Sequence, residues 1–177
     1  QSLAVGAKAR ALAEQFNLSS EQAEQSGWLH AVGAVVPVSE AVAAAQAYGV
    51  DVLPEEESLP VLLTQKLSAA LAQDLFGVAE PHVLSAIGCH LSLKMGTLPL
   101  DRAVFLAYHL TEATDSPDYL PVPLNEATGA SYYLAAAQDA LQRLHSLDAA
   151  VMYLCHYLWK QTESPVLRHP WFIDFFF

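Results

Sequence analysis

The sequence predicts an all-α fold, and three observations point to it. Apolar residues make up 53% of the 177 residues, which is typical of a packed globular chain. Alanine is abundant and runs of strand-forming residues are rare, so helices are favoured over strands. Apolar side chains recur at helical spacing, as at Leu3, Ala7 and Ala11. We therefore expect one helical bundle of about seven helices over residues 1–177.

The predicted helices are bounded by residues that cap or break helices. Ser19 suits the N-cap of the second helix, Gly49 suits the end of the third, and Pro81 suits the first position of the fifth. The acidic stretch 54–57 and the proline-containing stretch 115–123 are predicted to be loops. In order, the helices are expected over residues 2–16, 19–30, 40–48, 59–75, 81–90, 100–111 and 126–161, the last of them kinked or divided.

Charge and cysteine content exclude several classes of function. The net charge is −11 with only eight Lys and Arg, so nucleic acid and anionic membranes are not expected partners. Cys89 and Cys155 are too far apart for a zinc knuckle or a disulfide framework. We find neither a signal peptide nor an apolar run near 20 residues, so a cytoplasmic protein is expected. The sequence starts at Gln1, which leaves open whether residues precede it.

The chemistry-bearing residues alone support only a helical domain. Seven histidines are present, but none belongs to an HExxH pattern, and no glycine-rich phosphate loop occurs. His30 and His90 are predicted on helices with mostly apolar neighbours, where a lone histidine is more often a core residue than a ligand. Glu55, Glu56 and Glu57 form a charge run that is expected to be a solvated surface.

Two stretches resemble the HD superfamily of phosphohydrolases. The segment Gly27–Ala31 is similar to the helix with the "Gly-x-Leu-His-Asp" signature. The segment Ala86–Lys94 is similar to a later stretch of the form "Ala-Ile-x-x-His-Thr-Thr-Gly-Arg". The segment Ser164–Pro170 resembles a C-terminal "Pro-Ile-His-Pro" region. The order and spacing of these segments most resemble the YqeK family, the bacterial symmetrical bis(5′-nucleosyl)-tetraphosphatases.

The resemblance implies an HD-domain fold and a divalent metal such as iron, but the ligand positions have changed. Family members have histidines or aspartates at six motif positions, and this chain keeps a histidine at only two. At the two positions where family members have an aspartate, this chain has Ala31 and Tyr108. In chain order, the six relic metal-site positions are Gln1, His30, Ala31, Thr64, His90 and Tyr108.

These substitutions predict a pseudoenzyme with no catalytic residues and no metal. Carboxylates balance the charge of a hard cation, and without the metal no activated water forms. His109 does not replace the lost aspartate at Tyr108, because one residue along a helix turns a side chain by about 100°. The alternative is a metal-dependent nucleotide phosphohydrolase of the diadenosine tetraphosphate hydrolase type with a rebuilt site. A third hypothesis is an unrelated helical binding protein.

The sequence leaves the ligand and the partner open. A nucleotide or phosphate is the expected ligand, with Lys94 on the rim of a pocket that holds His30 and His90. In the alternative, the side chains of Tyr108 and Trp28 fill this pocket and no ligand binds there. The aromatic tail over residues 164–177 either packs on its own domain or anchors a homodimer or protein partner.

Overall fold

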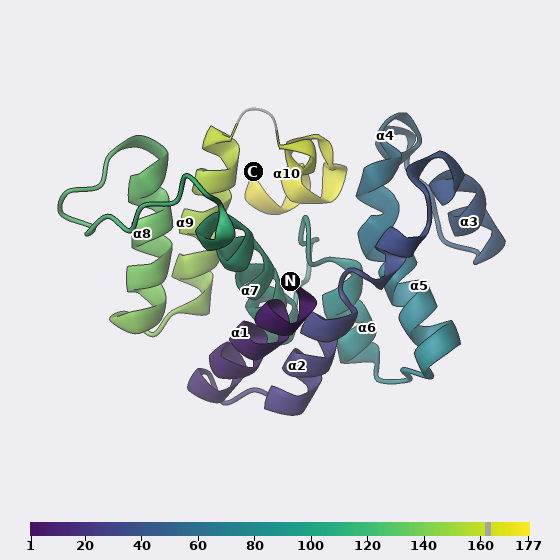
Figure 1. Ribbon diagram of the computed structural model, residues 1–177, viewed down its shortest axis with the longest axis horizontal. Helices are drawn as coiled ribbons and strands as arrows, with labels where there is room; N and C mark the ends of the chain where they lie inside the picture. Colours follow the sequence, from purple (N-terminus) through teal and green to yellow (C-terminus); the bar gives the residue numbers. More distant parts are fainter. Residues whose placement is uncertain (162–163) are drawn as a thin grey trace.

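The computed structural model describes residues 1–161 and 164–177, and within these ranges it is built from α-helices and short 3-10 helices without a strand (Figure 1). The all-α class predicted from the sequence is therefore confirmed. The α-helices are α1 (Ser2–Gln15), α2 (Ser20–Leu29), α3 (Ala41–Ala47), α4 (Pro54–Ser58), α5 (Thr64–Phe76), α6 (Pro81–Gly88), α7 (Pro99–Asp115), α8 (Gly129–Gln142), α9 (Leu147–Lys160) and α10 (Pro170–Phe176). The 3-10 helices are η1 (Val32–Val35), η2 (Val38–Glu40), η3 (Pro60–Leu63) and η4 (Pro165–Arg168).

Helix α7 lies at the centre of the fold (Figure 1) and contacts α1, α2, α6 and α9. Val104, Phe105, Leu106 and Ala107 on α7 are fully buried in the main hydrophobic core. Helices α5 and α6 pack on each other to one side of α7, and α8 and α9 pack on each other to the other side. Burial of this apolar surface is the main stabilising term of the fold.

A close contact between two glycines joins α1 to α2. A Cβ atom on Gly27 would lie 2.6 Å from the Cα of Gly6, so the two backbones touch with no room for a side chain. The Trp28 side chain packs directly on Gly6, because a Cβ on Gly6 would lie 2.4 Å from the Cδ1 atom of Trp28. This contact fixes the end of α2, from which His30 projects.

The structure contains more helices than the seven expected, for three local reasons. The predicted acidic loop is helix α4, which starts with Pro54 at its first position. The predicted stretch 126–161 is divided into α8 and α9 by a turn in which His145 has φ 47° and Ser146 caps α9. The tail forms η4 and α10, which His169 caps.

No single helix in the described ranges is both long and apolar enough to span a membrane. One bent helix pair, Ser20–Val35 with Val38–Ala47, satisfies the length and composition criteria only when its two parts are combined.

Candidate functional site

Three aromatic rings from different parts of the chain meet in the interior, and we name them the histidine–tyrosine cluster. His30 directly follows α2, His90 lies in the turn after α6, and Tyr108 projects from the middle of α7. The centroids of the two imidazoles are 5.0 Å apart, and the Tyr108 ring lies 5.3 Å from His30 and 4.9 Å from His90. Three of the six predicted metal-site positions therefore lie together, on separate elements.

The two histidines are held in the same way. The Nδ1 of His30 bonds the Gly27 carbonyl at 2.7 Å, and the Nδ1 of His90 bonds the Ile87 carbonyl at 2.7 Å. A carbonyl oxygen only accepts, so in both rings the proton sits on Nδ1 and the lone pair on Nε2. Within the described residues neither Nε2 has a hydrogen-bond partner. Metal-ligating histidines are commonly oriented by such a backbone bond.

Burial keeps the histidine–tyrosine cluster uncharged near neutral pH. His30 is 1% exposed, and burial is the main cause that lowers its pKa. Burial, with the nearby His30, lowers the pKa of His90 to about 3. Burial and the charge of Glu112 raise the pKa of Tyr108 to about 12. The cluster therefore offers two neutral nitrogens and a protonated phenol.

This donor set does not fit the hard divalent metal that the family resemblance implies. Iron, manganese and magnesium favour anionic oxygen ligands, whereas the histidine–tyrosine cluster contributes two neutral imidazoles and no carboxylate. In the described part of the chain, no group of three or more His, Cys, Asp or Glu side chains is arranged to hold a metal ion. Glu112, one turn beyond Tyr108 on α7, is the acidic residue whose charge reaches the cluster.

The remaining predicted metal-site positions are spread around the cluster. Ala31 follows His30 directly and is half-buried. Thr64 is the first residue of α5, and its hydroxyl donates to the Val61 carbonyl. Gln1 is exposed at the N-cap of α1. Whether all six positions converge on one metal stays a prediction.

Two further aromatic residues considered from the sequence have other roles. His109 is buried beside Tyr108, with ring centroids 4.8 Å apart, and its Nε2 bonds the Leu91 carbonyl at 2.8 Å. Its pKa is lowered to about 4, mainly by burial. Trp28 is 47% exposed and packs over Gly6. Tyr108 therefore lies against the two histidines, whereas Trp28 faces outward.

Lys94 lies in a different hollow from the two histidines. The cavity that it lines has a volume of about 300 Å³, and we name it the lysine–tryptophan pocket. Neither His30 nor His90 is among its lining residues. Its walls consist of Tyr48, Val50, Lys66, Ala69, Ala70, Gln73, Leu84, Ser85, Gly88, Lys94 and Trp171.

A buried ionic network, which the sequence did not predict, lies next to this pocket. Glu56 and His169 are 0% exposed and Lys66 is 8% exposed. Glu56 accepts from the Lys66 ammonium at 2.8 Å and from the His169 Nε2 at 3.1 Å. The interpretation of residues 55–57 as a solvated charge run is therefore wrong for Glu56, although Glu55 and Glu57 are exposed. We name these three residues the buried glutamate network.

Each member of the buried glutamate network is fixed by further bonds. The Trp171 backbone N–H donates to the His169 Nδ1, so Nδ1 is the acceptor and Nε2 carries the proton that is donated to Glu56. Lys66 also donates to the Asp51 carbonyl at 2.9 Å. Burial alone would raise the pKa of Glu56, but hydrogen bonds from His169, the Leu53 backbone and Lys66 outweigh it and lower that pKa. One sequence signal was present, since Glu56 occupies the N3 position of a helix that starts with a proline.

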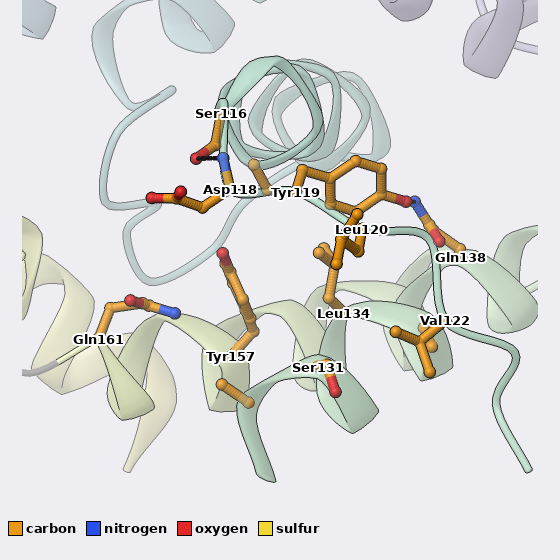
Figure 2. Close-up of a pocket in the computed structure, with 13 residues that line it drawn as sticks. Ser116, Asp118, Tyr119, Leu120, Val122, Ser131, Leu134, Gln138, Tyr157 and Gln161 are labelled. Carbon is orange, nitrogen blue, oxygen red and sulfur yellow. Dashed lines mark hydrogen bonds between the residues drawn. The ribbon is translucent and has the colours of Figure 1, made fainter. Parts of the chain in front are cut away.

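Two larger cavities lie along α7, and they share lining residues. The first, about 360 Å³, lies between the loop after α7 and helices α8 and α9 (Figure 2). The Tyr157 hydroxyl points into it near Asp118 and Gln161. The second, about 350 Å³, is lined by Tyr108 and Glu112, so it opens beside the histidine–tyrosine cluster. Tyr157 and Gln161 line both cavities.

The aromatic tail packs mostly on the rest of the chain. Phe172 is fully buried, and the Phe176 ring lies 4.9 Å from His156 on α9. Phe177 is 79% exposed and lies against Trp159, which is also exposed. The homodimer or protein partner expected through this tail stays a prediction.

Comparison with known proteins finds similarity to this chain both in sequence and in structure. No protein-family model matches the chain. An uncharacterized protein in the pepC 5′ region of Lactococcus lactis subsp. cremoris is 31% identical over 157 residues, which cover 89% of this chain and 72% of that protein. The crystal structure of a Clostridium acetobutylicum protein, named a predicted HD superfamily hydrolase involved in NAD metabolism, superposes with a TM-score of 0.76. The match is 20% identical and covers 98% of this chain and 83% of the clostridial one, and it confirms the predicted HD-domain fold.

Proposed function

We propose that this chain, which belongs to the family of the lactococcal pepC 5′-region protein and has the HD-domain fold, is a non-catalytic HD-like domain. In this proposal the domain acts as a ligand-binding or protein-interaction module in the cytoplasm. It is a degenerate relative of the YqeK-type tetraphosphatases, and it keeps their fold but not their hydrolytic site.

The proposal depends mainly on the chemistry of the histidine–tyrosine cluster. His30 and His90 present two neutral Nε2 atoms, but the ring packed against both is Tyr108, a protonated phenol. Two neutral nitrogens do not balance the charge of a divalent iron or manganese ion. The site then lacks the Lewis acid that would lower the pKa of an attacking water.

The alternative is a metal-dependent nucleotide phosphohydrolase with a rebuilt site, and one observation favours it. Both histidines keep the backbone-anchored tautomer that directs Nε2 outward, as in a metal-ligating histidine. A rebuilt site would need carboxylates from elsewhere, and Glu112 on α7 is the candidate.

The proposed ligand is a nucleotide or another phosphate compound. The clostridial neighbour is named for a role in NAD metabolism, and the resemblance to YqeK-type proteins also implies nucleotide chemistry. His30 and His90 are the proposed ligand contacts in the relic site, and Lys94 is the proposed cation. A homodimer through the exposed end of the tail, at Phe177 and Trp159, is the proposed assembly.

Metal content and hydrolysis test the proposal together. The purified protein is expected to contain no stoichiometric Fe, Mn, Zn or Mg by elemental analysis, and to hydrolyse diadenosine tetraphosphate no faster than a His30→Ala control. Near-stoichiometric iron, with turnover abolished by His30→Ala, would establish the alternative. The assay should include added Mn²⁺ and Fe²⁺, so that metal lost in purification does not imitate a missing site.

A further inference from the structure

Three cavities of about 300 Å³ or more differ in the charge of their walls. The two beside α7 contain Asp118 or Glu112 among their lining residues, and neither contains a Lys or Arg. The lysine–tryptophan pocket contains Lys66 and Lys94 and neither Asp nor Glu. The whole chain has eight Lys and Arg against nineteen Asp and Glu, so two cations in one hollow run against its overall charge. Of these three cavities among the described residues, the lysine–tryptophan pocket is the one suited to an anion.

The two lysines of this pocket meet at one indole ring. The Lys66 Nζ lies 4.6 Å from the Trp171 ring centroid, and the Lys94 Nζ lies 6.0 Å from it. Ammonium groups at such distances are attracted by the negative face of the ring. Both ammonium groups therefore lie beside the same indole ring, which forms part of the wall of the pocket.

The charges of the two lysines are not compensated to the same extent. Lys66 is bonded to Glu56 at 2.8 Å, and this buried pair is neutral overall. Lys94 forms no ion pair with any acidic residue in the described part of the chain, and it is half-buried. The pocket therefore has a net positive charge, and Lys94 is the residue that supplies it.

The remaining walls define the shape and polarity of the ligand. Val50, Leu84 and the alanines of α5 form apolar surface, whereas Gln73 and Ser85 bring polar side chains. Tyr48 also lines the pocket, and its hydroxyl donates to Asp74 at 3.2 Å. Such a mixture of apolar walls and a few polar groups is typical of small-molecule sites.

We infer that the lysine–tryptophan pocket binds a small phosphate monoester with an apolar or aromatic body, and that Lys94 is the cation that anchors the phosphate. The inference deepens the ligand-binding role in the proposed function and rests on it. It also moves the phosphate away from the histidine–tyrosine cluster, because His30 and His90 do not line this pocket. Metal binding and phosphate binding therefore become separate questions with separate tests.

The test is a titration of the whole chain with phenyl phosphate, followed by the indole N–H signals in NMR. The chain has three tryptophans, so the Trp171 signal is assigned by its loss in Trp171→Phe. Phenyl phosphate is expected to shift the Trp171 signal saturably, and inorganic phosphate to bind more weakly. Lys94→Met keeps most of the apolar stem and is expected to weaken binding about tenfold or more, because a charge-assisted bond is lost. Lys94→Arg keeps the positive charge and is expected to retain the affinity for phenyl phosphate.

Lys160→Met is the matched control, since Lys160 is exposed on α9 and does not line the pocket. Its affinity for phenyl phosphate should equal that of the unmodified chain. The inference is overturned if the Trp171 signal does not saturate, if Lys160→Met weakens binding as much as Lys94→Met, or if benzylamine binds as well as phenyl phosphate. Each of these results leaves the metal content untouched, so it can be distinguished from a failure of the proposed function.

Discussion

The histidine–tyrosine cluster and the buried glutamate network use buried histidine in opposite ways. His30 and His90 each satisfy one nitrogen with a backbone carbonyl and leave the other without a partner in the described residues. His169 uses both nitrogens, donating to Glu56 and accepting from the Trp171 backbone. Burial is nearly complete in all three cases. The second nitrogen therefore distinguishes a histidine that can take a ligand from one that only holds the fold together.

Restoring the lost metal ligands around the histidine–tyrosine cluster should have the largest effect of all the changes considered, and the effect is on metal affinity. A variant with Gln1→His, Ala31→Asp, Thr64→His and Tyr108→Asp is expected to bind Mn²⁺ or Fe²⁺ orders of magnitude more tightly than the unmodified chain. The new carboxylates supply negative charge, and the imidazoles complete the ligand shell. Calorimetry of the folded variant measures the gain. A matched variant with Asn in place of both new Asp residues should lose most of it, and equal affinity in the two would show that the positions do not converge.

Removing the acid of the buried glutamate network should give the largest loss of stability. Glu56→Ala leaves the Lys66 ammonium buried without its anion, which typically costs about 3–5 kcal/mol. Glu57→Ala removes an exposed neighbour and should change the free energy of unfolding by less than about 0.5 kcal/mol. Urea unfolding of both variants makes the comparison. Similar losses would contradict the structural role assigned to Glu56.

Acid should act on the buried His90 before it acts on the Glu56 carboxylate. The pKa of His90 is lowered to about 3 from an ordinary value of 6.5, so the unfolded chain binds more protons than the folded one between these values. Stability therefore falls as pH drops below 6.5, by about 2 kcal/mol at pH 5 for this one histidine. The lowered pKa of Glu56 adds a loss only below the ordinary carboxyl value near 4.5.

Unfolding free energies measured from pH 7 to pH 4 test this order. His90→Gln removes one titrating ring and should reduce the loss of stability between pH 6.5 and 5 by about the 2 kcal/mol assigned to His90. The pH dependence of His90→Gln must differ from that of the unmodified chain in this window, or the assignment to His90 is wrong. His109, whose pKa is lowered to about 4, contributes a similar loss that the variant keeps.

The last prediction concerns the support of His30. Gly27→Ala should cost about 1–3 kcal/mol, because its Cβ would meet the Gly6 backbone at 2.6 Å and α1 and α2 would have to separate. Gly88→Ala is the control near His90, since its Cβ would lie an ordinary 3.4 Å from Ala69. Thermal unfolding of both variants compares the two sides of the cluster. A neutral Gly27→Ala would contradict the tight contact.

Much of the fold could be predicted from local sequence patterns, because capping residues and helical spacing are local. The division of residues 126–161 was left open, since the turn at His145 contains neither glycine nor proline and only the cap at Ser146 marks it. The meeting of His30 with His90 was predicted through the family resemblance, as helical periodicity does not relate residues on separate elements. Glu56 and Lys66 were missed because a charge run most often faces solvent, and burial against a distant histidine leaves no local pattern.

The buried glutamate network also has a consequence for the order of folding. Glu56 and Lys66 are ten positions apart, whereas Glu56 and His169 are separated by 113. Closing a long loop costs more chain entropy than closing a short one, so we expect the contact between Glu56 and Lys66 to form earlier than the contact between Glu56 and His169. During synthesis, helices α4 and α5 are complete before His169 is added. We therefore expect α10 to dock late in folding, after Glu56 and Lys66 have come together.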